Sequence, residues 1–395
     1  MGKRAKKGHR KEMRALVDNA DGGVALAVIR SLGRRGIDIT AASGIPSALS
    51  FRSKYCKRKV LYTSPEKDEN KFLHEMLEIV KRGNYDVLFT MGGYEMELIS
   101  RHREKFVPYV KIPLAAHETL EKAVDKYQTF KTAIENNIPC PQTYLMADDL
   151  TKLVNRFEFP AVIKPRKGEG AKGLAIINSK DELKNIKYNK HQGYIVQEYI
   201  PYEEKYAVAC IFNHDSKPRR ACVLKYIREH PITGGVSTFA ESVERADVLK
   251  YALKLLKVLN YYGVAEVEFV VDSRDKKPKL MEINPRFWGS LSAAISAGVD
   301  FPYLLYRMAI DGDIKPSLNY KVGVKCRNLL FGDIRYLVDM MKGTWPKHVK
   351  LQTLVNFLKF HEDRAYYILS LDDPMPAIFK VIRSISHMIK SKDQA

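Results

Sequence analysis

The sequence is poor in cysteine, and none of its five cysteines is spaced for a metal or redox motif. They are scattered along the 395 residues, and no two form a CxxC pair: Cys56, Cys140, Cys210, Cys222 and Cys326. This spacing argues against a disulfide framework and a cysteine-based zinc site, and it favours a reducing compartment such as the cytoplasm. The ten histidines show no metal-ligand spacing either, and only His230 is a candidate base.

Long apolar segments are also missing. No uncharged apolar run reaches the roughly 18 residues that a membrane helix needs, so no membrane span is expected. The first stretch, MGKRAKKGHRKEMR, is basic and is not followed by an apolar core, which argues against a secretory signal. The sequence has no GxSxG motif and no paired Cys/His pattern. A nucleophilic hydrolase is therefore not predicted.

Acidic residues are too few to balance the basic ones. The chain has 66 Lys and Arg against 46 Asp and Glu, a formal charge of +20, and residues 1–14 alone hold seven of the cations against Glu12. We expect residues 1–14 to be a flexible basic arm. The remaining excess is spread along the chain with no aromatic-interleaved basic motif, so no specific nucleic-acid partner is predicted.

What is present indicates a folded protein of two or three domains, since 45% of the residues are hydrophobic and 10% are aromatic. Over residues 15–115, short apolar strands alternate with amphipathic helices, which predicts a Rossmann-like parallel sheet. Ligands bind such sheets beyond the carboxyl ends of the strands. This unit lacks GxGxxG, so no dinucleotide site is predicted.

The stretch PKLMEINPRFWGS, residues 278–290, carries the strongest chemical signal. On a strand, Glu282, Asn284 and Arg286 point to one face because side chains alternate. Glu268 lies on the preceding strand of the same predicted hairpin. Two carboxylates and an amide oxygen form a hard oxygen site that suits Mg²⁺, and Arg286 would hold an anionic group. A pair of salt-bridged hairpin carboxylates is the plainer alternative.

A second set of residues could contact phosphates. Lys164 ends the apolar strand AVIK, and the loop PRKGEGAKGL follows with Gly168, Gly170, Lys172 and Gly173. Glycines allow backbone N–H groups to approach phosphates, although the Walker A pattern is absent. Lys225 and Arg228 lie on a later strand; Lys225 could reach a triphosphate and Arg228 a substrate carboxylate. Either could equally be a surface charge.

The order of these motifs over residues 112–312 resembles the ATP-grasp superfamily, and in particular the carbamoyl-phosphate-synthase-like ligases of unassigned substrate. The superfamily resemblance rests on DKYQTFKTAIENNIPCPQTY, FPAVIKPRKGEGAKGLAII, YIVQEYIP and PKLMEINPRFWGS. The finer resemblance rests on LKYIREHPITGGVSTFAESV and EINPRFWGSLSAAISAGVDFPYLLY. The superfamily resemblance implies that Lys126 and Lys164 contact ATP phosphates and that the glycine loop is the flexible loop of that family, and it favours the phosphate contact of Lys225. It further implies that Gln197, Glu198 and Ile200 surround the adenine, with Glu204 (or Glu203) at the ribose. It implies that Glu268, Glu282 and Asn284 bind two Mg²⁺ ions, which Mn²⁺ could replace. Arg286 would contact the acyl phosphate.

We therefore expect an α/β protein with an ATP-grasp fold. The expected parts are an arm at 1–14, a Rossmann-like domain at 15–115, an ATP-grasp domain at 116–312 (divided at 195/196) and a helical region at 313–395. The expected function is an ATP- and Mg²⁺-dependent ligase that joins a small, amino-acid-like carboxylate to an amine through an acyl phosphate. Two alternatives stay open: a bicarbonate-activating, carbamoyl-phosphate-type enzyme, and a basic nucleotide-responsive protein on RNA or membrane with little turnover. A homo-oligomer is also left open.

Overall fold

A computed structural model describes residues 13–146, 158–168, 173–185, 193–232, 234–359 and 364–392. Gly170, Lys172 and residues 1–12 of the predicted arm lie outside these ranges. Within the described residues, no helix is long and apolar enough to cross a membrane. All five cysteines lie in the described part and carry free thiols.

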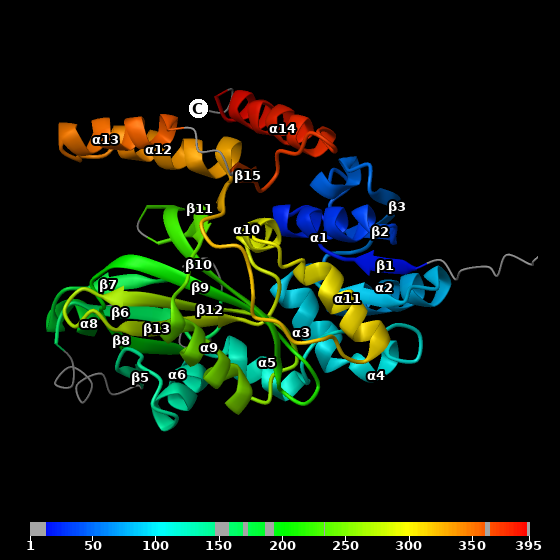
Figure 1. Ribbon diagram of the computed structural model, residues 1–395, viewed down its shortest axis with the longest axis horizontal. Helices are drawn as coiled ribbons and strands as arrows, with labels where there is room; N and C mark the ends of the chain where they lie inside the picture. The colour runs from blue at the N-terminus through cyan, green and yellow to red at the C-terminus, as the bar shows by residue number, and fades with distance from the viewer. Residues whose placement is uncertain are drawn as a thin grey trace, which may run out of the picture.

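The amino-terminal part is a parallel four-stranded sheet flanked by helices, as the alternating pattern predicts (Figure 1). The strand order is β3-β2-β1-β4. Strand β1 lies between β2 and β4, and its residues Ala15, Leu16 and Val17 are fully buried. The strands are β1 (Arg14–Val17), β2 (Asp38–Ser43), β3 (Cys56–Leu61) and β4 (Val87–Phe89). The helices are α1 (Gly23–Arg34), α2 (Glu69–Gly83), α3 (Gly93–Arg101) and α4 (Arg103–Phe106).

The sequence pattern predicts one helix from about residue 117 to 136, and the structure has two helices there. The chain breaks at Asp125, whose carboxylate caps α6 by accepting from the backbone N–H groups of Tyr127 and Gln128. An N-cap residue has extended rather than helical backbone, so α5 (His117–Val124) ends where α6 (Lys126–Glu135) begins. This break places Lys126 at the first position of α6.

A small antiparallel sheet follows, with its own apolar core of Ala161, Ile163, Ile177, Leu183 and Val196. Its strand order is β5-β8-β6-β7. The elements are β5 (Thr143–Leu145), β6 (Ala161–Pro165), β7 (Ala175–Ile177), α8 (Lys180–Asn185) and β8 (Tyr194–Glu198).

A seven-stranded sheet forms the centre of the molecule, in the order β13-β12-β9-β10-β11-β14-β15. It is antiparallel except for the last pair. The strands are β9 (Tyr202–Phe212), β10 (Pro218–His230), β11 (Val236–Ser242), β12 (Gly263–Asp272), β13 (Pro278–Asn284), β14 (Lys325–Arg327) and β15 (Arg364–Tyr366). The helices that follow or cover them are α9 (Ala246–Val258), α10 (Leu291–Ser296) and α11 (Phe301–Asp311). The predicted hairpin, with its polar turn at 272–277, is present as β12–β13.

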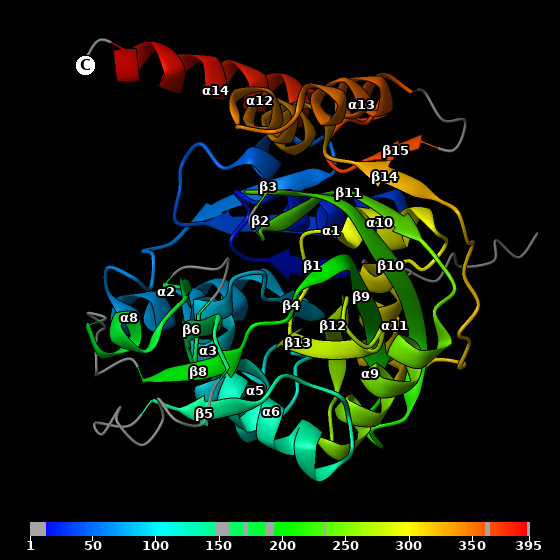
Figure 2. The same cartoon turned by 90° about the vertical axis from the view of Figure 1, so that its left-hand side faces the viewer.

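The carboxyl-terminal region is more than the helices expected from the sequence, because β14 and β15 extend the central sheet. Both strands have only three residues, too few to show an alternating pattern. The π-helix η3 (Leu329–Asp333) leads into α12 (Ile334–Lys342) and α13 (Lys347–Leu358), and α14 (Met375–Lys392) ends the described chain. These three helices lie along one side of the molecule (Figures 1 and 2).

Candidate active site

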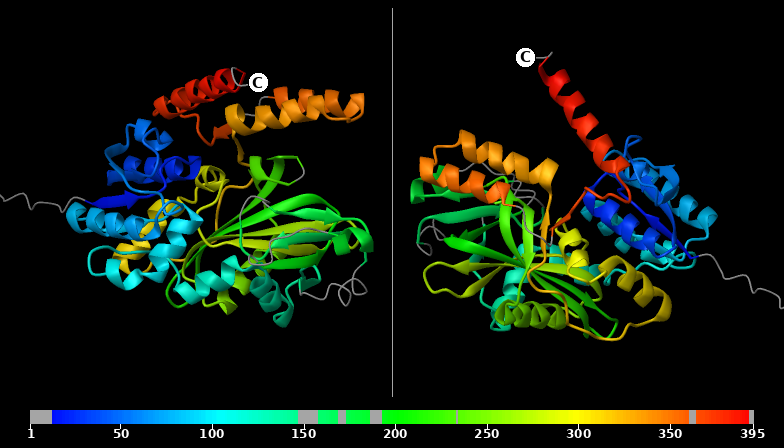
Figure 3. Two further views of the ribbon diagram at one scale, coloured as in Figure 1. Left: turned by 180° about the vertical axis from the view of Figure 1, so that it is seen from behind. Right: turned by 45° about the horizontal axis from the view of Figure 1, so that its top comes forward.

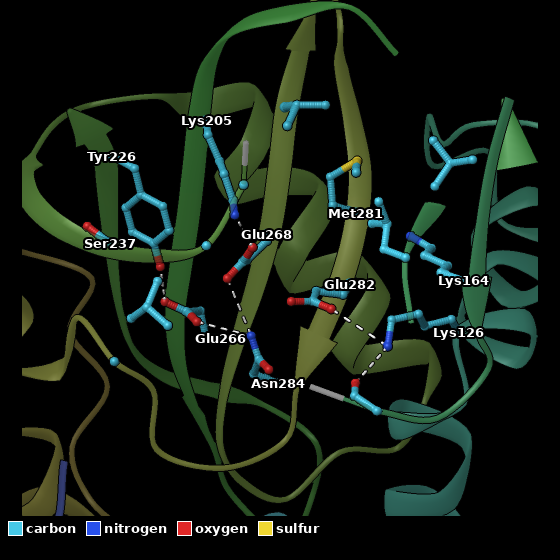
Figure 4. Close-up of a pocket in the computed structure, with 18 of the residues that line it drawn as sticks. Lys126, Lys164, Lys205, Tyr226, Ser237, Glu266, Glu268, Met281, Glu282 and Asn284 are labelled. Carbon is cyan, nitrogen blue, oxygen red and sulfur yellow. Dashed lines mark hydrogen bonds and ion pairs between the residues drawn. The ribbon is translucent and has the colours of Figure 1, made fainter. Parts of the chain in front are cut away.

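A cavity of about 460 Å³ lies between the small sheet and the central sheet. One wall carries Lys126 from α6 and Lys164 from β6, and the other carries side chains of β9, β10, β12 and β13. Figure 4 shows the acidic side chains of β12 and β13 directed into the space that the two lysines enter from the opposite side.

The β12–β13 hairpin brings four polar side chains to one face. In the antiparallel register Glu268 is opposite Glu282, and Glu266 is opposite Asn284. The Asn284 amide nitrogen lies 3.2 Å from Glu266 Oε2 and 3.4 Å from Glu268 Oε1. Both of these donor contacts use the amide nitrogen. The amide oxygen of Asn284 therefore points the other way, and Arg286 Nη2 lies 3.5 Å from it. The predicted metal residues are therefore together.

Lys205 offsets the buried negative charge of this face. Its Nζ lies 2.8 Å from Glu268 Oε2 and 2.8 Å from Glu229 Oε1. Burial raises the pKa of Glu268, with Lys205 acting in the opposite direction and Glu282 adding to the rise. Lys205 was not predicted as a site residue, although it lies on β9, the strand that follows β8.

The two predicted phosphate lysines face the hairpin. Lys126 Nζ lies 3.8 Å from Glu282 Oε2 and donates to the Gly168 carbonyl oxygen at 2.9 Å. Lys164 is buried, with Nζ 5.2 Å from the centre of the Phe130 ring. Burial lowers the pKa of Lys164 to about 8, while Glu282 favours its charged form.

Another part of the cavity lining is apolar. Leu174 and Ile176 from the small-sheet side and Val270 and Met281 from the central sheet line it. Gln197, Glu198 and Ile200 lie along its edge where β8 leaves the small sheet. The Gln197 side chain donates to Thr143 Oγ1 at 2.8 Å, and Glu198 accepts from Arg274 at 2.5 Å. The predicted adenine residues thus line the cavity.

The donor set fits Mg²⁺. Within the described residues, no three His, Cys, Asp or Glu side chains are grouped to hold a metal ion by themselves. Glu268, Glu282 and Asn284 instead offer two carboxylates and an amide oxygen on neighbouring strands, and Mg²⁺ takes few protein ligands when phosphate oxygens and water complete its shell. A cation at this position would also relieve the repulsion between Glu268 and Glu282 that helps to raise the pKa of Glu268.

Glu204, Lys225 and Arg228 do not line the cavity. Glu204 and Lys225 pair with each other at 2.5 Å beside Arg245, next to the start of α9, on the face of the sheet opposite to Lys205. Arg228 is buried and binds both oxygens of Asp333 at 2.8 and 2.9 Å, under the carboxyl-terminal helices. These placements do not support a contact of Glu204 with a ribose, of Lys225 with a triphosphate or of Arg228 with a substrate, and those contacts stay predictions.

Other predicted residues have mixed placements. Gly168 lines the cavity with φ of 142°, a backbone conformation that favours glycine, and Gly173 lies in the same loop outside the lining. Glu203 is exposed and does not line the cavity. His230 Nε2 lies 3.0 Å from Asp339 Oδ2, away from the site.

The structure adds Glu266, Tyr226 and Ser290 to the site. Glu266 Oε1 accepts from Tyr226 Oη at 2.6 Å and from Ser290 Oγ at 3.2 Å, and burial with the nearby Glu268 raises the pKa of Glu266 to about 8. Glu266 and Glu268 are two residues apart in the sequence EVEF and so share one face of the strand. The alternation that predicted the metal face could therefore also have predicted Glu266. Tyr226 and Ser290 have no such signal.

The chain is similar to known proteins over this region. The family model described as "ATP-grasp domain" matches residues 123–290. The D-aspartate ligase of Enterococcus faecium is 25% identical over 244 residues, which cover 54% of this chain and 58% of that protein. The chain thus spans little more than half the length of this relative.

Two solved structures share the architecture. A biotin carboxylase–βγ-ATP complex from Campylobacter jejuni superposes with a TM-score of 0.66 at 16% identity, over 80% of this chain and 74% of that chain. An L-amino acid ligase from Bacillus licheniformis gives a TM-score of 0.61 at 16% identity, over 77% and 78%.

Proposed function

We propose that the protein is an ATP- and Mg²⁺-dependent ligase that joins a carboxylate to an amine with release of ADP, on the premise that residues 123–290 match the ATP-grasp domain model. The observation that carries the proposal is the convergence of Lys126 and Lys164 with Glu268, Glu282 and Asn284 around one cavity. Fold alone would not license an activity. A wall of cations facing a wall of oxygen ligands is the arrangement that a metal–triphosphate requires.

The nucleotide would lie along the cavity with its base at the apolar part of the lining. Leu174, Ile176 and Met281 offer apolar contact, and the β8 hinge of Gln197, Glu198 and Ile200 borders the base. Lys126 and Lys164 would contact the phosphates. Lys126 is held at the start of α6 by the Asp125 cap, which fixes its backbone before any ligand arrives.

Glu268, Glu282 and Asn284 would hold two Mg²⁺ ions, which would neutralise phosphate charge. Glu266 orients this set, because it binds the Asn284 nitrogen and leaves the amide oxygen for a ligand. Glu266 is itself fixed by Tyr226 and Ser290. Arg286, adjacent to Asn284, would stabilise the negative charge that develops on the transferred and acyl groups.

In the proposed reaction, a substrate carboxylate oxygen bonds to the γ-phosphorus while the bond to the β–γ bridging oxygen breaks and ADP leaves. The amine nitrogen then bonds to the acyl carbon, phosphate leaves, and the amine loses a proton. The products are an amide, ADP and phosphate. The protein contributes positioning and charge stabilisation rather than a covalent residue.

Amino-acid-like substrates are the favoured class, since the D-aspartate ligase and the L-amino acid ligase among the similar proteins carry such substrates in their names. The test is Mg²⁺-dependent ADP release by the purified protein with a panel of amino acids and small carboxylates, each with and without amines. Stimulation by one carboxylate–amine pair supports the proposal. Stimulation by bicarbonate alone would overturn it in favour of a bicarbonate-activating enzyme, and absence of ATP binding would overturn the site itself.

A further inference from the structure

The last helix, α14, turns its apolar side away from the protein. Met375, Ile378, Ile382 and Ile385 are 48–56% exposed. Their spacing of three, four and three residues places them on one side of the helix. The opposite side contacts the body: Ala377 is buried, and Arg383 Nη1 binds Asp21 Oδ1 at 2.7 Å. This is the reverse of an ordinary surface helix, which buries its apolar side.

Helix α13 repeats the pattern. No residue of α13 is buried, and Leu351, Leu354, Val355 and Leu358 are 38–63% exposed at helical spacing. Trp345, in the turn between α12 and α13, is 46% exposed. Large apolar side chains that are exposed as a group, rather than singly, mark an interaction site.

The helices that carry these exposed side chains form one layer. Helices α12, α13 and α14 run along the same side of the molecule in two views at right angles and again from behind (Figures 1, 2 and 3). We name this layer, residues 334–359 and 375–392, the helical platform. It lies at a distance from the hairpin of the candidate active site, on the side where β14 and β15 end the central sheet.

The charge of the helical platform indicates what covers it. Of the five Lys or Arg in residues 334–359, Arg335, Lys342, Lys347 and Lys359 are exposed, against the single acidic residue Asp339. On α14, Lys380 and Arg383 face the body instead: Lys380 Nζ lies 4.6 Å from the centre of the Phe331 ring, and Arg383 pairs with Asp21. Two copies of the chain meeting through this layer would bring these like charges together, on chains that each carry +20. An anionic surface would instead attract these cations. Each cation that comes near such a surface would raise the binding affinity about fivefold.

We propose that the helical platform docks on anionic phospholipid membranes, with α13 and α14 lying in the plane of the interface. Exposed apolar side chains with exposed Lys and Arg nearby, here the cations of residues 334–359, are the combination that inserts into the headgroup boundary without spanning the bilayer. Trp345 is placed to sit at the headgroup level, where tryptophan is favoured. This inference does not depend on the ligase activity.

Trp345 provides a direct readout, because the only other tryptophan, Trp288, is fully buried. The full chain would be mixed with phosphatidylcholine vesicles containing about 30% phosphatidylglycerol, and with vesicles of phosphatidylcholine alone. We expect a blue shift of Trp345 emission, and quenching by phosphatidylcholine brominated on its acyl chains, only when the anionic lipid is present. A Trp345→Phe variant should lose both signals. Unchanged emission with anionic vesicles at low salt would overturn the proposal.

Vesicle co-sedimentation tests the apolar side itself. The triple change Ile378→Ser, Ile382→Ser and Ile385→Ser should weaken binding about tenfold or more, since each change removes apolar contact with lipid. The matched control, Leu61→Ser, Val107→Ser and Ile134→Ser, alters side chains that are 51–57% exposed elsewhere, and it should bind as the unchanged protein does. Equal binding by both triple variants would overturn the proposal. So would a dimer in solution that the α14 variant dissociates.

Discussion

At the scale of single residues, the candidate site is governed by which charges are paired before a ligand binds. Among the described residues, Glu268 is paired with Lys205 at 2.8 Å, while the ion pair of Glu282 is a longer one with Lys126 at 3.8 Å. Glu282 is thus the carboxylate most open to a new cation, and Lys126 and Lys164 are the cations most open to a new anion.

Glu282→Gln should lower Mg²⁺-dependent ATP turnover by ~100-fold or more, because the amide cannot supply the charge that a metal–phosphate complex needs. The side chain is partly exposed, so the fold should persist. ADP release and the far-ultraviolet circular dichroism spectrum measure the two properties. Glu135→Gln on the exposed surface of α6 is the control. An active Glu282→Gln variant would contradict the assigned metal set.

Lys164 should make ATP binding sensitive to pH. Its pKa is lowered to about 8 from the ordinary value of 10.5, so its cationic fraction falls between about pH 7 and pH 9. We expect the dissociation constant for ATP, measured by calorimetry, to rise across this range. Lys164→Arg keeps its charge and should remove the rise. The same pH dependence in both proteins would show that another group is responsible.

At the scale of elements, the break between α5 and α6 positions Lys126. Asp125 caps α6 and also pairs with Arg166, which follows β6. One side chain therefore joins the helix that carries Lys126 to the strand that carries Lys164.

Asp125→Ala should lower the free energy of unfolding by about 1–3 kcal/mol, and it should also weaken ATP binding because Lys126 loses its fixed position. Asp68→Ala is the control, since Asp68 caps α2 in the same way by accepting from the Lys71 backbone N–H, far from the cavity. The control should lose about 1 kcal/mol and bind ATP normally. Urea unfolding and calorimetry give both quantities. A purely structural role of Asp125 would leave ATP affinity unchanged.

At the scale of the whole molecule, the carboxyl-terminal segment is anchored on the amino-terminal domain by a buried ion pair. Arg30 Nε lies 2.9 Å from Asp373 Oδ2, and both side chains are almost fully buried. Ser53 Oγ and the Lys54 backbone N–H also donate to the Asp373 carboxylate. Residues more than 300 positions apart thus share one network.

Asp373→Ala should lower the free energy of unfolding by about 3–5 kcal/mol, because it leaves the buried Arg30 guanidinium unpaired. The neighbouring pair of Arg34 and Asp372 is exposed, so Asp372→Ala should cost only about 1 kcal/mol or less. Urea unfolding of the two variants makes the comparison. Similar losses would show that burial does not distinguish the two pairs.

Much of the molecule followed from local patterns. Alternating strands and helices predicted the parallel sheet, and period-two alternation predicted that Glu282 and Asn284 share a face. The short strands β14 and β15 could not be predicted, since three residues carry no usable period. The helix break at Asp125 was missed because a capping aspartate inside an otherwise helical pattern also reads as an ordinary helical residue.

The sequence by itself determined the hairpin and the identity of its acidic face, because strand geometry alone orients neighbours two residues apart. Only the tertiary structure decided which side of β9 and β10 meets the cavity. Lys205 faces it and Glu204 does not, since α9 lies against the other side of the sheet. A register shift between Tyr226 and Glu229 then interrupts the alternation, so Glu229 joins Lys205 while Arg228 turns to Asp333. Packing of distant segments, which no local pattern encodes, set these choices.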